Sequence, residues 1–364
     1  MDILMNFQDW FFTERFWLPG NTTWNELRNI PGDHTYIPQA YELTLIFPAA
    51  AGLFIIRKLF ETLVAAPVGR SYGLSDKKVT AVPNAALENL YKQSQYPERQ
   101  SIEALTKQTD LSDKQIQRWL RRRRNQDRST RLTKFTETAW RCFYYLAIFI
   151  YGLCVVSQES WFWDVKDCFR GYPRQHVKPA VFWYYIIELG FYLSLLFSQF
   201  VDVKRKDFWE QFVHHIATIT LMAGSFTANY TRIGALILCL HDASDILLES
   251  AKLARYVEKR TLCDALFGIF TISWAVTRLT IFPYVIIWSA VFDSREQSGS
   301  SPFLVILNGL LIVLLILHIF WFCSIMTVLI KALQYGKVDK DVRSASEESC
   351  EEDANTMNGA GQHS

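Results

Sequence analysis

Residues 303–330 read FLVILNGLLIVLLILHIFWFCSIMTVLI, an apolar run that contains no lysine, arginine, aspartate or glutamate. A transmembrane helix needs about 20 residues at a rise of about 1.5 Å each, so this run can cross a bilayer as a tilted helix. Among the 364 residues 50% are hydrophobic and the formal net charge is only +2, yet the charges collect between apolar runs. Because a soluble core does not segregate its residues in this way, the sequence predicts a polytopic helical membrane protein.

Similar runs recur along the chain and predict an all-α fold with about seven transmembrane helices. We place the spans at residues 39–58, 139–156, 180–200, 212–230, 233–253, 264–291 and 303–330. The other segments are an N-terminal segment, a basic helical insert and an acidic tail, at residues 1–38, 68–130 and 331–364.

The composition of the tail predicts disorder. Ser344 and Ser349 each precede a glutamate by three residues, a pattern that acidophilic kinases phosphorylate. A tail that only solubilises the chain fits this composition equally well.

Lysine and arginine in the connecting segments predict the orientation of the spans. The 59–138 connection is strongly basic, whereas the 228–232 turn and the 293–302 loop on the other side hold one arginine each. The N-terminus is therefore expected to be lumenal and the C-terminus cytosolic. Asn21 begins a glycosylation sequon on the predicted lumenal side, which agrees, while the sequon at Asn229 lies close to the membrane.

The basic insert resembles the second half of a homeodomain. After a helix start at residues 111–113, residues 114–125 read KQIQRWLRRRRN, a basic helix that carries Trp119. A homeodomain has an adenine-binding asparagine three residues after this tryptophan, but here that residue is Arg122. No first helix is recognisable, so we expect no sequence-specific DNA binding. The arginines better suit an anionic membrane surface or a polyanionic ligand.

Polar side chains inside the predicted spans are costly and mark function by default. The fourth span carries a histidine pair and the fifth a polar stripe, which together comprise His214, His215, His241, Asp242, Asp245 and Glu249. From the cytosolic side, His214 lies about 12 Å along its helix and Asp245 about 15 Å along the next. A histidine–carboxylate pair can therefore form between these antiparallel helices.

Three uses of these residues stay open. A metal site needs the same residue types, but the spacing of iron-binding histidine boxes is missing, since Gln211 stands three residues before His214. A structural polar network between packed helices is the second alternative. Acid–base or nucleophilic chemistry without a metal ion is the interpretation we favour.

Three further polar residues lie in other spans. We expect Arg278 to hold an anionic group of a substrate, or else to balance an aspartate. Glu188 either faces the same cavity, where it would bind substrate, or pairs structurally. His318 has no obvious partner and is expected to be interior packing.

Four stretches resemble the ceramide synthases, a family of enzymes with a Lag1/TLC membrane domain. They read WFWDVKDCFRGYP, FSQFVDVKRKDF, FVHH and LCLHDASDILLE, at residues 161–173, 197–208, 212–215 and 238–249. The homeodomain-like insert and the acidic tail are similar to animal members of the family. The resemblance covers about residues 40–350.

The resemblance implies an endoplasmic-reticulum acyltransferase that moves a fatty acyl group from acyl-CoA to the amine of a sphingoid base, sphinganine or sphingosine, to make dihydroceramide or ceramide. Six of the helices would form a TLC-type bundle over residues 139–330, and homo- or hetero-dimers with family members would be allowed. No cofactor is implied, because acyl-CoA is a substrate. Residues 292–302 match the loop implicated in acyl-chain length, but their serine-rich sequence predicts no length.

By matched positions, the resemblance implies catalytic roles for His214, His215, Asp242 and Asp245, with His241 in the same motif. We favour His214 as a nucleophile that forms an acyl-imidazole, His215 as the base, and one of the aspartates as the residue that orients them. A histidine that acts only as a general base is the alternative. Two other functions stay open, a catalytically silent lipid-binding or transport protein and a membrane-tethered transcriptional regulator.

Overall fold

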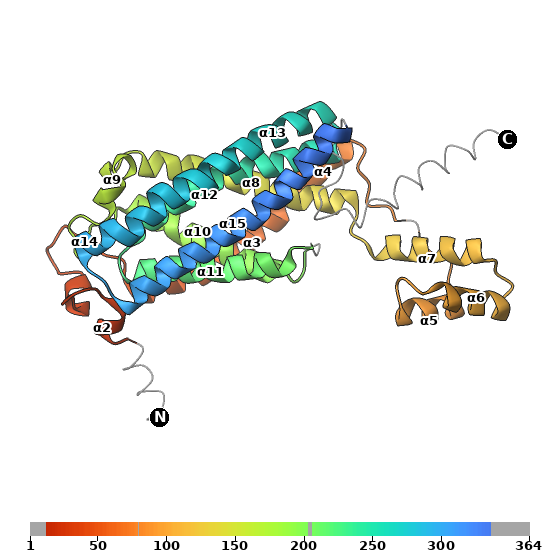
Figure 1. The fold of residues 1–364 in the computed structure, drawn as a ribbon, viewed down its shortest axis with the longest axis horizontal. Coiled ribbons are helices and arrows are strands. Elements are labelled where there is room, and N and C mark those ends of the chain that lie inside the picture. The colour runs from red at the N-terminus through yellow and green to blue at the C-terminus, as the bar shows by residue number, and fades with distance from the viewer. Residues whose placement is uncertain (1–11, 79, 203–205, 336–364) are drawn as a thin grey trace, which may run out of the picture.

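The computed structural model describes residues 12–78, 80–202 and 206–335, and within these ranges every regular element is a helix. The predicted all-α fold is therefore confirmed. Figure 1 shows the long helices side by side in one elongated bundle, with three short helices set apart beyond one end. Ser344 and Ser349 lie outside the described residues, as does most of the predicted tail.

The long helices lie where the apolar runs predicted spans. They are η2 (Ala40–Leu45), α3 (Ile46–Phe60), η3 (Glu61–Ala65) and α4 (Ala66–Ser71) in series, α8 (Arg131–Val156), α10 (Pro179–Ser198), α11 (Phe208–Thr227), α12 (Thr231–Tyr256), the series α13 (Arg260–Val276), η5 (Thr277–Ile287), η6 (Ser289–Asp293) and α14 (Ser294–Ser298), and α15 (Pro302–Tyr335). Proline begins both α10 and α15, at a position where the backbone N–H has no partner within the helix.

Five helical stretches are long and apolar enough to cross a membrane: Ala40–Ser71, Asp113–Val156, Pro179–Ser198, Arg260–Ser298 and Pro302–Gln334. The helices α11 and α12 are missing from this set, within the described ranges, because they carry the histidines and carboxylates. They are packed inside the bundle, α11 against α10 and α15, and α12 against α8 and α13. The multi-pass membrane fold is confirmed, and the count of about seven spans stays a prediction.

The N-terminal segment covers one end of the bundle. It includes the short helices α2 (Glu14–Trp17) and η1 (Trp24–Leu27), and Figure 1 shows it at the end where α14 lies. The ring centroids of Trp17 and Phe303 are 3.9 Å apart, and the Ser301 hydroxyl donates a hydrogen bond to the Trp17 carbonyl at 3.1 Å. These contacts fix the segment to the start of α15.

The two glycosylation sequons differ sharply in exposure. Asn21 is exposed. Asn229 is only 1% exposed, and its amide donates to the carbonyls of Pro173 and Gln175 at 2.9 Å and 3.2 Å. An amide that is buried and engaged in this way is closed to a glycosyltransferase in the folded protein.

The basic insert folds as three helices, α5 (Ala85–Gln93), α6 (Arg99–Gln108) and α7 (Asp113–Asp127). The predicted start of the basic helix is confirmed, since the Ser112 backbone N–H donates to the Gln115 side chain at 2.8 Å in a capping box. The expectation that a first helix is missing is wrong. The helix α5 fills that place, with Leu87 and Tyr91 buried on one face.

These three helices enclose a core of their own, made by Leu87, Tyr91, Ile102, Ile116, Trp119 and Leu120. The Trp119 indole N–H donates to the Val82 carbonyl at 2.5 Å. Arg122, which stands where a homeodomain has its adenine-binding asparagine, is exposed.

Candidate active site

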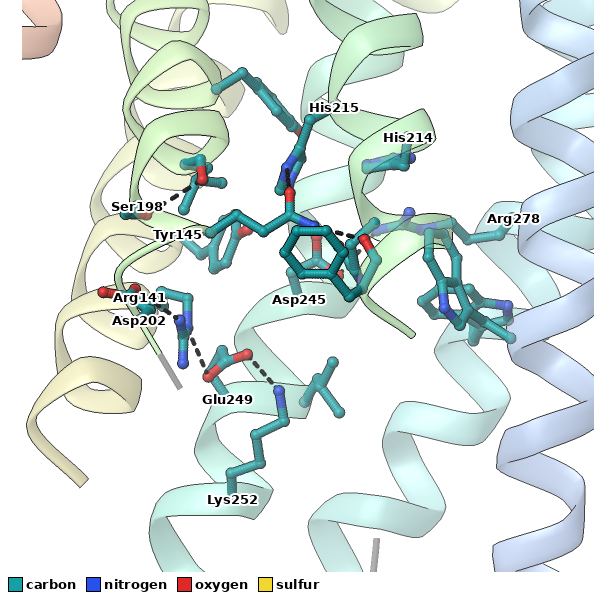
Figure 2. Close-up of a pocket in the computed structure, with 18 residues that line it drawn as sticks. Arg141, Tyr145, Ser198, Asp202, His214, His215, Asp245, Glu249, Lys252 and Arg278 are labelled. Carbon is teal, nitrogen blue, oxygen red and sulfur yellow. Dashed lines mark hydrogen bonds and ion pairs between the residues drawn. The ribbon is translucent and has the colours of Figure 1, made fainter. Parts of the chain in front are cut away.

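A cavity of about 150 Å³ lies inside the bundle, and the predicted histidine pair lines it. Its wall is built by α8, α10, α11, α12, α13, η5 and α15, so helices far apart in the sequence converge there. Figure 2 shows His214, His215, Asp245 and Arg278 around it, with a charged group gathered toward one end that comprises Arg141, Asp202, Glu249 and Lys252.

His215 is buried and is hydrogen-bonded through one ring nitrogen. Its Nδ1 lies 3.1 Å from Oε1 of Gln199, the residue that follows α10. Its Nε2 makes no hydrogen bond within the described ranges. This second nitrogen is therefore left for a ligand in the cavity.

His214 is held by aromatic packing instead. Its ring meets the Trp321 ring edge-on with 5.4 Å between centroids, and the Tyr192 ring is 6.4 Å away. Its Nδ1 is buried and has no hydrogen-bond partner in the described part of the chain. Leaving a buried polar atom unpaired is unfavourable, and such atoms in native proteins often belong to groups that act on a substrate.

Asp245 pairs with an arginine and not with a histidine. Arg278 donates through Nη2 to Asp245 Oδ1 at 3.0 Å and to the His241 carbonyl at 2.8 Å, and through Nε to the Ser244 hydroxyl at 3.2 Å. Its guanidinium also lies 4.6 Å from the Trp274 ring centroid. Of the two expectations for Arg278, the structure therefore supports charge balance with an aspartate.

The histidine–carboxylate pair that the helix depths allow is not formed among the described residues. Neither His214 nor His215 has a hydrogen bond or ion pair with Asp242 or Asp245. Asp245 lines the same cavity as the histidines, but it forms its ion pair with Arg278. Depth along two helices fixes the level of their side chains and leaves open the direction in which each one points.

The arginine lies at the start of a widened helix. The segment η5 (Thr277–Ile287) has π-helical hydrogen bonding and contains Pro283, which has no N–H to donate. Insertions of this kind rotate the residues on either side and recur at functional sites. Hydrophobic periodicity gave no sign of this segment.

Asp242 lies apart from the cavity and faces Glu188, with both side chains fully buried. The two carboxyl groups interact directly, and Asp242 also interacts with the Tyr184 hydroxyl. Carboxyl groups in such contact hydrogen-bond each other only when one carries a proton. Glu188 is thus placed as the structural partner of Asp242, and the expectation that it faces the cavity is not met.

His241 and His318 form a layer with Phe282 beside the arginine. The ring centroids of His241 lie 5.0 Å from those of both His318 and Phe282. His241 Nδ1 is 2.6 Å from the Ile237 carbonyl, and His318 Nε2 is 3.3 Å from Nη1 of Arg278. His318 therefore has a polar partner and is more than the interior packing that we expected.

The charged group at one end of the cavity is held by ion pairs of unequal length. Lys252 lies 2.6 Å from Glu249, and Arg57 lies 2.8 Å from Asp202. Arg141 is 3.5 Å from Glu249 and 3.9 Å from Asp202, and its buried Nε has no hydrogen-bond partner in the described chain. The long separations leave the Arg141 guanidinium available to an anionic ligand.

A second cavity of about 60 Å³ is lined mainly by apolar side chains of α11, α12 and α15. Its lining includes Thr218 and Met222 of α11 and Leu304 and Leu314 of α15. It therefore lies farther along α11 than the histidines, toward the end of α15 that the N-terminal segment covers. The layer formed by His241, His318 and Phe282 comes between the two cavities along α12 and α15.

Some residues of the cavity were missed by reading the sequence. Gln199 lies inside one of the stretches that carry the family resemblance, but an isolated glutamine at a helix end gives no chemical signal. Trp321 lies within an apolar run, where aromatic residues are common. Arg141 lies near the start of a span and reads as a residue at the membrane surface.

The chain matches known protein families over the whole region that forms the cavity. The TLC domain matches residues 134–327, and the homeodomain matches residues 78–129. The chain is 46% identical to human ceramide synthase 5 over 346 residues, which cover 94% of this chain and 88% of that protein. It is 42% identical to human ceramide synthase 4 over 349 residues, with 95% and 88% covered. It is 34% identical to ceramide synthase hyl-1 of Caenorhabditis elegans over 352 residues, with 93% and 84% covered.

Proposed function

Because the chain belongs to the ceramide synthase family and is thus an acyltransferase that makes ceramide, we propose that its histidine pair carries an acyl group from acyl-CoA to the amine of a sphingoid base. The observation that carries this proposal is the unequal environment of the two adjacent histidines in one cavity. Within the part of the chain that the structure describes, His214 has a buried nitrogen without a hydrogen-bond partner, and His215 is anchored at Nδ1 by an amide oxygen. One ring therefore suits covalent chemistry and the other suits proton transfer.

The first step is attack of an imidazole nitrogen of His214 on the thioester carbon of acyl-CoA. The C–S bond breaks, CoA leaves as the thiolate, and the acyl group stays on the ring. Thioesters are already activated, so the chain needs to supply the nucleophile, its orientation and a polar wall for the oxyanion. The paired charges of Asp245 and Arg278 lie in that wall.

In the second step the sphingoid ammonium gives one proton to the CoA thiolate, and the resulting neutral amine attacks the acyl-imidazole. His215 takes the proton that the amine loses, the bond between His214 and the acyl carbon breaks, and the amide is released. In sum, acyl-CoA and the sphingoid ammonium give the amide, CoA thiol and one proton. The proposed route needs no metal and no cofactor besides the acyl-CoA substrate.

The first cavity has a charged end and the second cavity is apolar, and acyl-CoA likewise has a charged CoA part and an apolar acyl chain. The phosphates of CoA would meet the charged group that contains Arg141 and Lys252. The acyl chain would extend along α11 toward the second, apolar cavity. The homologues imply these substrates, and their placement is our proposal.

Loss of Arg141 is expected to weaken acyl-CoA binding more than turnover. In Arg141→Gln, the KM for acyl-CoA should rise about ten-fold, because one charge-assisted contact to a phosphate is lost. The matched control is Arg70→Gln at the exposed ion pair with Asp76, which should change neither constant. An unchanged KM in Arg141→Gln contradicts this placement of the CoA phosphates.

The proposed function is tested with purified full-length protein, sphinganine and a ladder of acyl-CoAs. Mass spectrometry should detect an N-acyl product for at least one chain length, and EDTA should leave the yield unchanged. Omission of sphinganine should let an acyl adduct accumulate on the peptide that contains His214. The absence of an N-acyl product with every acyl-CoA would contradict the proposed function and favour a silent lipid-binding protein.

We further propose that this multi-pass protein lies in the endoplasmic reticulum membrane with its N-terminus in the lumen. The exposed Asn21 should then carry a glycan, and the buried Asn229 should not. Peptide N-glycosidase should shift the wild-type band on a gel and leave Asn21→Gln unmoved. If the glycosidase does not shift the wild-type band, the lumenal placement of the N-terminus is contradicted. If it still shifts the band of Asn21→Gln, a glycan is attached to Asn229.

A further inference from the structure

Gln199 links the end of α10 to the histidine pair on α11 through both ends of its side-chain amide. The amide nitrogen donates to the Phe208 backbone carbonyl at 2.6 Å, and the amide oxygen lies 3.1 Å from His215 Nδ1. Gln199 follows the last residue of α10, and Phe208 is the first residue of α11. The amide thus spans the connection between the two helices.

The partners of this amide determine which way round it lies. A backbone carbonyl can only accept a hydrogen bond, so the NH₂ group of Gln199 must face Phe208. The oxygen then faces His215, and because it can only accept, His215 must donate from Nδ1. The lone pair of the neutral ring is therefore on Nε2, the nitrogen that has no protein partner in the described ranges.

The neighbouring histidine has no equivalent support. His214 packs against the rings of Trp321 and Tyr192, and its Nδ1 is buried without a hydrogen bond in the described chain. Packing fixes the position of a ring but does not select its tautomer. The two members of the pair are therefore distinguished by one amide side chain.

We propose that Gln199 is a positioning residue that holds His215 in the Nδ1–H tautomer and so makes it the base of the pair. This inference rests on the proposed function and extends it to the roles of the two histidines. When Nε2 takes the amine proton, the ring becomes an imidazolium, and its Nδ1–H bond to the Gln199 oxygen becomes charge-assisted and stronger. The proton then leaves from Nε2 to solvent, and the starting tautomer returns.

The test separates the two half-reactions in full-length protein. Gln199→Met keeps the length of the side chain and removes both hydrogen bonds. We expect adduct formation on the His214 peptide to stay within about three-fold of wild type. Release of the amide should slow about 10- to 100-fold, as for loss of a hydrogen bond to a charged group, and the apparent KM for acyl-CoA should fall as release becomes rate-limiting. Acyl adduct should consequently accumulate in the steady state.

A second variant reports on the proton itself. Gln199→Glu keeps an acceptor oxygen toward His215, and its negative charge favours the imidazolium. Activity should recover relative to Gln199→Met, and the acid limb of the pH–rate profile should move to higher pH. The matched control is Gln158→Met, at another glutamine that donates to a backbone carbonyl, far from the cavity at the end of α8, and it should match wild type.

Several results would overturn the proposal. Equal slowing of both half-reactions in Gln199→Met together with a lower unfolding temperature would make Gln199 a structural residue only. A pH–rate profile in Gln199→Glu that coincides with wild type would show that the amide does not act on His215. If wild type forms neither adduct nor N-acyl product, the proposed function fails first, and this outcome is distinct from the other two.

Discussion

Replacing His214 with alanine is expected to abolish ceramide formation, with a fall in turnover of about 10³-fold or more. The variant loses the only nitrogen on which we place the acyl group, and the remaining ring is held by Gln199 for proton transfer. Folding should survive, because His214 makes no hydrogen bond in the described chain and contributes mainly packing against Trp321. The intact mass of the protein after incubation with acyl-CoA reports whether an adduct forms.

The matched variant is His215→Ala. It should still take up the acyl group, since it keeps the nucleophile, but it should release almost no amide to sphinganine. An adduct that persists in His214→Ala and disappears in His215→Ala would reverse the two roles. Normal turnover in His214→Ala would rule out the acyl-imidazole route.

The sequence predicted which residues line the histidine-containing cavity better than it predicted the contacts between them. A histidine pair and an acidic residue in neighbouring polar helices identified His214, His215 and Asp245, because charged and polar groups are rare within apolar runs. It could not show that Asp245 is bound by Arg278, since that contact depends on how α12 and η5 are rotated against each other. The same limit applies to Gln199, whose role comes from a hydrogen bond across 16 residues and not from its residue type.

The fold was predicted in the same uneven way. Apolar runs located every long helix, because burial in a bilayer demands a long uninterrupted apolar stretch. Several helices extend beyond these runs: α8 begins at Arg131, before the predicted start at 139, and α4 ends at Ser71, after the predicted end at 58. Only the second half of the three-helix unit was recognised as homeodomain-like, because the tryptophan and the basic residues that carry the likeness lie on α7, and α5 joins that helix only through the shared core around Trp119. The pairing of Glu188 with Asp242 was left open, since helical periodicity places both in the interior without saying which side chains meet.

The loss of Arg278 is expected to be the most destabilising change in the cavity. In Arg278→Met, the Asp245 carboxylate remains inside the bundle without its cation, and removal of one member of a buried ion pair costs about 3–5 kcal/mol. The bonds to the Ser244 hydroxyl and the His241 carbonyl are lost as well. We expect a clearly lower unfolding temperature in detergent, a smaller yield of monodisperse protein and no ceramide formation.

Removing the negative charge at the same time separates stability from catalysis. The double variant Arg278→Met/Asp245→Asn contains no unpaired charge at this place, so its unfolding temperature should be close to that of wild type. Activity should not return, because the polar wall beside the histidines is gone. The control Arg70→Met at an exposed ion pair should change stability by less than about 1 kcal/mol. If the single and double variants are equally unstable, Arg278 stabilises the bundle through Ser244 and His241, and its bond to Asp245 serves the reaction alone.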